Sequence, residues 1–185
     1  RVFATGGIGG AHRGSELNFD ISADLTQLAR SATNVVCAGP KAILDIPKTI
    51  ELLESLGIPL ITYKEENVPA FWSRDSGIAS PIVAKSVREI VDSFIIRSEL
   101  GLKTAQLICN PIPLKDEISR EEISPLIDES IKIALAKNIV GKELTPFLLS
   151  QILSSTQGKS LKANEALLFN NIDLATKIAN TLSKI

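Results

Sequence analysis

Long apolar runs and blocks of one charge are both missing from this sequence. No stretch approaches the roughly 18 apolar residues that a membrane-spanning helix needs. The 20 basic and 21 acidic residues nearly cancel, which is not the charge balance of a general nucleic-acid binder. We therefore expect neither a membrane nor a nucleic acid as a partner, whereas a small phosphorylated ligand is compatible with this composition.

Cysteine and methionine are also scarce, with two and none in the chain. Cys37 and Cys109 each lie within a short apolar run, where a thiol usually serves as a small core residue. This placement predicts neither a disulfide framework nor a zinc site. Because methionine is missing and Arg1 leads directly into a strand-like segment, we expect further sequence to precede it.

The composition is typical of a soluble protein, and we expect a cytoplasmic location. The last three residues, Ser183, Lys184 and Ile185, differ at one position from the Ser-Lys-Leu signal of peroxisomal proteins. A peroxisomal location is therefore the alternative, although a helical tail can end in Lys-Ile without any such cause.

Short β-branched and apolar runs end at glycine or proline and alternate with longer segments of helical period. This alternation predicts an α/β fold of three α/β/α layers with a mainly parallel central sheet. With 44% hydrophobic residues, the chain can bury one sizeable core, so we expect a single domain over residues 1–185. The predicted strands are Val2–Thr5, Asn34–Ala38, Leu60–Tyr63 and Ala105–Cys109.

Helices are predicted where a capping residue precedes an apolar period, as at Ser86 with Glu89 three residues later. The least regular stretch, Lys64–Lys85, is either an active-site flap or a long surface loop. The last 40 or so residues are predicted to be all-helical. The predicted helices are Asp45–Gly57, Ser86–Leu100, one that begins at Ser119, Thr145–Ser154 and Leu161–Leu182.

A glycine-rich segment, Gly6–Gly14, follows the first predicted strand, and ligands of open α/β sheets bind beyond the carboxyl ends of strands. Glycines allow a tight backbone path and leave N–H groups open to an anion or a planar base. The spacing fits neither the dinucleotide fingerprint nor the P-loop, so the segment is either a ligand cradle or a structural crossing. His12, the only histidine, is either a structural residue or part of that site.

Two acids and a serine follow in Asp20-Ile21-Ser22-Ala23-Asp24. One interpretation is that Ser22 or Asp20 caps a helix over Leu25–Arg30. The other is that a carboxylate binds a hard metal ion and the next residues bind a phosphate or sugar. A single carboxylate completed by water would suit Mg²⁺ or Mn²⁺ better than zinc.

Lys41 follows the second predicted strand after Gly39-Pro40 and precedes another apolar run. Most lysines are solvated surface charges. We expect this amine to be partly desolvated, however, and desolvation favours the neutral form that attacks carbonyl groups to make a Schiff base.

Two asparagines have similarly open interpretations. Asn110 begins the rigid turn Asn110-Pro111-Ile112-Pro113 after the last predicted strand, where its amide either faces a ligand or merely ends the strand. Asn164 either contacts a ligand or is an ordinary residue near the start of a helix.

Six segments resemble the pseudouridine-5′-phosphate glycosidases, a family that includes the indigoidine synthase A-like proteins. They span nearly the whole chain in order, which makes the resemblance specific. It implies reversible cleavage of the carbon–carbon glycosidic bond of pseudouridine 5′-phosphate to uracil and ribose 5-phosphate. The segments are FATGGIGGAHRG from Phe3, FDISADLTQLAR from Phe19, VVCAGPKAILDIPKT from Val35, NPIP from Asn110, GKELTPFLL from Gly141 and SLKANEALLFNN from Ser160.

The resemblance implies roles residue by residue. Asp20 matches the family's Mn²⁺-binding aspartate, with Mg²⁺ as the other candidate ion. Lys41 matches the lysine that forms an imine with C1′ of the opened ribose. Matches to substrate-binding residues are Ser22, Ala23 and Asp24 in a segment that contacts the substrate, and Asn164, Thr5 and His12 near the uracil.

The resemblance also implies a homotrimer and an N-terminal portion that supplies a glutamate acid and a phosphate-site lysine, neither of which has a counterpart in these residues. Two alternatives stay open. One is a related enzyme that forms a C-glycoside with another acceptor, because the family's reaction is reversible. The other is a non-catalytic subunit that only binds sugar phosphate.

Overall fold

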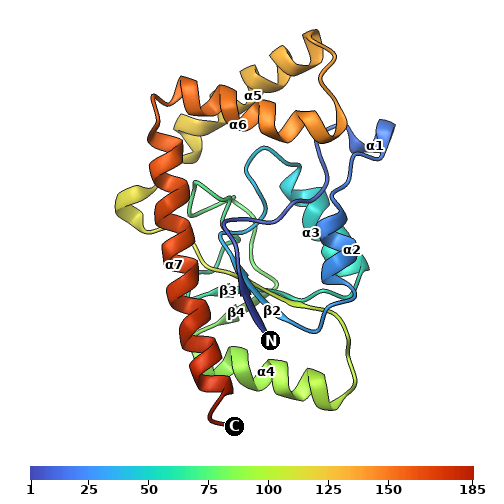
Figure 1. Cartoon of the computed structure of the whole chain (residues 1–185), viewed down its shortest axis with the longest axis vertical. Helices are drawn as coiled ribbons and strands as arrows, with labels where there is room; N and C mark the ends of the chain where they lie inside the picture. Colours follow the sequence, from blue (N-terminus) through green and yellow to red (C-terminus); the bar gives the residue numbers. More distant parts are fainter.

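In the computed structural model, which describes residues 1–185 apart from the side chain of Lys142, five parallel strands form the central sheet (Figure 1). Their order across the sheet is β1-β2-β5-β3-β4, so β5 lies between two pairs of strands. The predicted mainly parallel α/β fold is therefore confirmed. The strands are β1 (Val2–Ala4), β2 (Asn34–Cys37), β3 (Leu60–Tyr63), β4 (Ile82–Ala84) and β5 (Gln106–Cys109).

Helices cover both faces of this sheet. Side chains alternate along each strand, so Val35 and Cys37 of β2 face α2 and α3, whereas Val36 faces α4 and α7. Buried apolar residues thus fill both layers, as expected for a parallel sheet. The helices are α1 (Ser15–Asn18), α2 (Ala23–Leu28), α3 (Ile46–Ser55), α4 (Val87–Glu99), α5 (Arg120–Ala136), α6 (Leu144–Ser155) and α7 (Lys159–Leu182), with 3-10 turns at Leu114–Asp116 and Gly141–Glu143.

A third apolar cluster lies beyond the carboxyl ends of the strands. There α5 and α6 pack over the sheet together with the first part of α7, which then continues down to α4 (Figure 1). Ile127 of α5, Leu148 of α6 and Leu167 of α7 share this cluster with Trp72 and Ile43. The predicted all-helical C-terminal segment therefore forms a cap next to the edge where ligands of such sheets bind.

The capping predictions are confirmed at two helices. Ser86 Oγ accepts a hydrogen bond from Glu89 N at 3.2 Å, and Ser119 Oγ accepts one from Glu122 N at 3.3 Å. The same side chains therefore satisfy N–H groups that the first helical turn leaves free.

The segment 64–85 differs from a long surface loop, one of its two interpretations. It contains β4, and its middle is buried, with Val68, Phe71 and Trp72 each at most 5% exposed. Phe71 N donates to Ala38 O at 2.9 Å, which ties this segment to the end of β2. The surface-loop interpretation is wrong for this middle part, because its aromatic side chains are buried in the core. The strands are too short to fill that part of the core themselves.

The two cysteines are core residues, as predicted. Cys37 and Cys109 lie opposite one another in β2 and β5, and both are free and fully buried. Contact with Cys37, together with burial, raises the pKa of the Cys109 thiol well above its ordinary value. Among the helices of the described residues, none combines the length and the hydropathy that a bilayer-spanning segment requires.

Candidate functional site

The glycine-rich segment and the turn that carries Lys41 lie side by side beyond the ends of β1 and β2. Ile8 N donates to Gly39 O at 3.2 Å, and Lys41 N donates back to Ile8 O at 3.1 Å. This pairing continues the contact of the two strands past the sheet. It places half-buried Lys41 at the carboxyl edge, where the sequence predicted it.

Two glycines in this segment are required by close packing. A Cβ atom at Gly9 would overlap the side chain of Ser22, and one at Gly10 would overlap Thr49. Thr49 Oγ1 also accepts a hydrogen bond from Ala11 N at 3.1 Å, so α3 fixes the backbone path of the segment. At these positions the segment is a structural crossing, one of its two interpretations.

The segment Ser22–Asp24 packs directly under the glycines. Ser22 Oγ accepts a hydrogen bond from Asp24 N at 3.2 Å and so caps α2, as one interpretation proposed. Asp24 Oδ2 accepts from Gly9 N at 2.7 Å. Ala23 and Asp24 are exposed, so solvent reaches the short segment that packs against the glycine-rich backbone.

His12, Asp20 and Lys41 form a second group. His12 is 8% exposed, its Nε2 lies 3.2 Å from Thr145 Oγ1 of α6, and its backbone N donates to Asp20 O at 3.0 Å. Burial lowers the pKa of His12; nearby Asp20 opposes this shift, and the positive charge of Lys41 adds to it. The structure therefore brings these three predicted residues within electrostatic reach of one another.

The lowered pKa of His12 predicts a dependence of stability on pH. Because its pKa in the folded protein lies below the ordinary 6.5, the unfolded chain binds the proton more readily. The contribution of neutral His12 to stability should be fully present above that ordinary value. It should be lost as the pH drops through that value toward the pKa of the folded protein. The melting temperature, measured with a chelator present, should fall from about pH 7.5 to about pH 5.5.

The matched variant is His12→Gln, which keeps a hydrogen-bonding side chain but cannot titrate. Its melting temperature should fall less over the same pH range. An equal fall in parent and variant would show that other groups cause the acid sensitivity.

Asp20 is the predicted metal ligand. Its side chain is half-buried, and the described part of the chain offers its carboxylate no hydrogen-bond partner. Nor do the described residues contain a cluster of three or more histidine, cysteine or acidic side chains that could enclose an ion. The donor set therefore fits a hard cation held by one carboxylate and water, and it does not fit zinc.

The predicted residues do not all line one hollow. Thr5 and Asp24 line a hollow of about 470 Å³ between β1 and α2. His12 and Asp20 line a separate one of about 70 Å³ below the α5–α6 cap. Lys41, whose backbone pairs with Ile8, lines neither. The glycine-rich segment runs from one hollow to the other and so connects the two groups.

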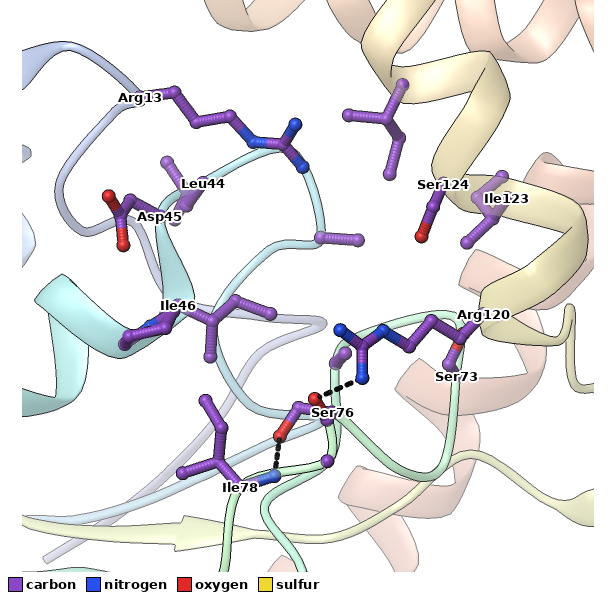
Figure 2. A pocket seen from close by; sticks show the side chains of 15 residues that line it. Arg13, Leu44, Asp45, Ile46, Ser73, Ser76, Ile78, Arg120, Ile123 and Ser124 are labelled. Carbon is purple, nitrogen blue, oxygen red and sulfur yellow. Dashed lines mark hydrogen bonds between the residues drawn. The ribbon is translucent and has the colours of Figure 1, made fainter.

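A further cavity of about 370 Å³ lies between the start of α3, the segment 70–78 and the first turns of α5 (Figure 2). Arg13 and Arg120 extend toward it from different sides. Arg13 Nη1 donates to Asp128 Oδ1 at 2.5 Å and Arg120 Nη1 to Ser76 O at 2.9 Å. Both guanidinium groups thus have partners in the protein, and no predicted site residue lines this cavity.

The two asparagines behave differently. Asn110 Nδ2 donates to Asn171 Oδ1 at 3.2 Å, and Asn171 Nδ2 donates to Thr5 O at 2.8 Å. Asn110 therefore ties the ends of β1 and β5 to α7, which is its structural interpretation. Asn164 instead accepts a hydrogen bond from Trp72 Nε1 at 2.7 Å.

Sequence reasoning missed three residues that fix the candidate site, namely Trp72, Thr49 and Thr145. Trp72 is the only tryptophan and stands beside Phe71 in the least regular stretch, a signal that could have marked it as core. Thr49 and Thr145 each act through one hydroxyl on a residue 38 or 133 positions away, and no local pattern predicts such a contact.

The family model described as "Indigoidine synthase A like protein" matches residues 1–181. A pseudouridine-5′-phosphate glycosidase of Paracoccus denitrificans is 52% identical over 98% of this chain and 60% of its own length. One of Brachyspira hyodysenteriae is 47% identical over all of this chain and 60% of its own length. The chain thus spans about 60% of these relatives.

Two solved structures share the fold. An indigoidine synthase A-like protein of Thermotoga maritima superposes with a TM-score of 0.88 at 40% identity, covering 97% of this chain and 58% of its own. The prealnumycin C-glycosynthase AlnA was solved in complex with ribulose 5-phosphate. It superposes with a TM-score of 0.93 at 28% identity, and the match covers 100% of this chain and 61% of AlnA.

Proposed function

Because the chain belongs to the indigoidine synthase A-like and pseudouridine-5′-phosphate glycosidase family, we propose that it reversibly cleaves pseudouridine 5′-phosphate to uracil and ribose 5-phosphate. The observation that carries the proposal is the 52% identity to such a glycosidase over 98% of this chain. The position of Lys41 at the carboxyl edge of the sheet supports it.

The chemistry needs an amine because a C-glycoside has no leaving oxygen or nitrogen that an acid could protonate. In the proposed reaction, Lys41 Nζ bonds to C1′, the C1′–O4′ bond breaks, and O4′ takes up a proton. The nitrogen lone pair then forms an imine as the C1′–C5 bond breaks, and C5 of uracil takes up a proton. Water hydrolyses the imine, which releases ribose 5-phosphate and restores the amine.

The other predicted residues bind the two halves of the substrate in this proposal. Ser22, Ala23 and Asp24 contact the ribose phosphate or its hydroxyl groups. Ser22 can still donate its hydroxyl proton, and the exposed Asp24 carboxylate can accept from a sugar hydroxyl. Residues proposed near the uracil are Thr5, His12 and Asn164.

We also propose that Asp20 holds Mn²⁺ or Mg²⁺ largely through water. Such an ion supplies positive charge that stabilises developing negative charge. Asp20→Asn removes the charged ligand and keeps the volume, so calorimetric titration should show Mn²⁺ affinity reduced by at least about a hundredfold, with a matching loss of turnover.

Asp173→Asn is the control for this experiment, because Asp173 pairs with Lys177 on the surface of α7. It should bind Mn²⁺ like the parent. If Asp20→Asn kept the parent's titration curve, the ion would bind elsewhere.

A homotrimer is the proposed assembly. In addition to the family resemblance, large apolar side chains are exposed along α7 at helical spacing, and such a stripe is more typical of an interface than of a free surface. They are Leu161, Leu168, Phe169 and Ile172.

The direct test of function is an assay of the full-length protein with pseudouridine 5′-phosphate and Mn²⁺. Chromatography should show uracil and ribose 5-phosphate appearing in equal amounts, and the same protein should form the C-glycoside from the two products. Formation of neither product would refute the proposal.

A C-glycoside synthase that uses another acceptor is the second candidate, because the likeness to prealnumycin C-glycosynthase covers the whole chain. Its 28% identity is well below the 52% to the glycosidase of Paracoccus denitrificans. Ribose 5-phosphate supplied with uracil or with an aromatic acceptor distinguishes the two, since only the accepted partner should be consumed.

A further inference from the structure

The contact between Trp72 and Asn164 has a fixed direction. Trp72 is 1% exposed and its Nε1 lies 2.7 Å from the side-chain oxygen of Asn164. An indole N–H can only donate, so the amide must offer Oδ1 to it. Asn164 Nδ2 therefore points away from Trp72, and within the described residues it has no hydrogen-bond partner.

The neighbours of Trp72 and of Asn164 pack against the glycine-rich segment. A Cβ atom at Gly7 would come within 2.6 Å of the ring of Phe71, and the Phe71 and Trp72 rings are 5.0 Å apart. Leu167 lies nearly one turn after Asn164 in α7, and a Cβ atom at Gly6 would come within 3.3 Å of its side chain. Phe71, which adjoins Trp72, and α7, which carries Asn164, thus both pack against the backbone that follows β1.

The backbone around Trp72 is held from two sides. Trp72 O accepts a hydrogen bond from Ile118 N at 3.0 Å, and neighbouring Phe71 N donates to Ala38 O at 2.9 Å. Because Ala38 directly follows β2 on the way to Lys41, Trp72 and the proposed covalent catalyst share one rigid support.

From this geometry we infer that Trp72 is a positioning residue that makes Asn164 a hydrogen-bond donor to the substrate's base. The inference rests on the proposed function and deepens it. The site would then recognise a carbonyl oxygen on the base and reject an amino group at the same position. Without the indole N–H, the Asn164 amide could turn over and accept from an amino group instead.

The inference predicts how the protein chooses its base. Uracil has two carbonyl groups, whereas cytosine and isocytosine each replace a different one with an amino group. In the direction of C-glycoside formation from ribose 5-phosphate, the parent should prefer uracil to both. Trp72→Phe, which keeps an aromatic ring but removes the N–H, should reduce that preference about tenfold for one of the two analogues.

Two further variants separate positioning from packing. The Asn164→Asp side chain still accepts from Trp72 but has no donor. Activity with uracil should therefore fall more than activity with the amino analogue. Phe71→Leu removes the neighbouring ring and keeps the indole N–H. It should change KM for all three bases together and leave their ratio at the parent value.

A spectroscopic measurement checks the hydrogen bond without turnover. The indole N–H signal that disappears in Trp72→Phe identifies Trp72 in a ¹⁵N spectrum. Asn164→Ala should shift that signal and speed its exchange with solvent. An unchanged signal would overturn the inference.

The outcomes also distinguish this inference from the proposed function. If the parent joins uracil to ribose 5-phosphate and Trp72→Phe keeps the parent's base preference, the inference is wrong and the proposed function stands. If the parent joins no base to ribose 5-phosphate, the proposed function falls, and base recognition by Asn164 falls with it.

Discussion

Sodium borohydride added with ribose 5-phosphate should attach the reduced sugar phosphate permanently to the peptide that contains Lys41. The reagent reduces the imine between Nζ and C1′ to a stable secondary amine. Lys41→Ala should give no adduct and lower turnover by at least about a thousandfold, because it removes the nucleophile. Mass spectrometry of the digested full-length protein identifies the modified residue.

Lys41→Arg should fail equally, since a guanidinium stays protonated and forms no imine. Both variants should keep the parent's melting temperature within a few degrees, because a half-buried side chain at a ligand site contributes little to core packing. Lys103→Ala is the control, because Lys103 lies in the exposed segment before β5, at the opposite edge of the sheet. An adduct at another lysine, with full activity in Lys41→Ala, would replace the proposed nucleophile.

A sugar-phosphate-binding subunit without catalysis predicts a different pattern. Such a protein would bind ribose 5-phosphate and give no borohydride adduct at any lysine. An ordinary surface lysine, in turn, predicts unchanged rates in Lys41→Ala and Lys41→Arg. The trapping experiment therefore separates all three interpretations of Lys41.

The largest expected loss of stability is that of Gly39→Ala. Gly39 has a φ of +87°, and a Cβ atom there would overlap the backbone oxygen of Pro69, which cannot turn aside as a side chain can. Left-handed strain and overlap together should lower the free energy of unfolding by about 4 kcal/mol. Urea denaturation measures the change.

Gly57→Ala is the matched control, because Gly57 has a φ of +67° and nothing within 4 Å of its Cβ position. Its free energy of unfolding should fall by only about 1 kcal/mol, the cost of the left-handed conformation alone. Equal losses in the two variants would show that the approach of Pro69 to Gly39 contributes nothing. Gly39→Ala should also lose activity at temperatures where it stays folded, since Lys41 follows two residues later.

Much of the fold could be predicted from the sequence because its signals are local. The strand that leads to Cys37 is a continuous apolar run, and the capping serines stand directly before their helices, so both follow from neighbouring residues. Strand β4 was missed because it has only three residues, the first of them 46% exposed, and such a segment carries no periodic pattern.

The candidate site was predictable mainly through resemblance. Spacing alone left Asp20, Ser22 and Asn164 with two interpretations each, and only the matched segments indicated one of them. Contacts such as Asp24 with Gly9 or Trp72 with Asn164 join residues 15 and 92 positions apart. The topology of the sheet and cap, which no local pattern encodes, brings them together.

The position of β5 between two strand pairs has a consequence for how the chain folds. β2 and β3 never pair with each other, so the sheet becomes continuous only when β5 enters between them, with Asn34 and Gln106 72 positions apart. During synthesis the β1-β2 and β3-β4 pairs emerge before β5, each with the edge that β5 will join still unpaired. Closing such long loops is slow, so completion of the sheet by its central strand should limit the folding rate, with aggregation as the competing outcome until then.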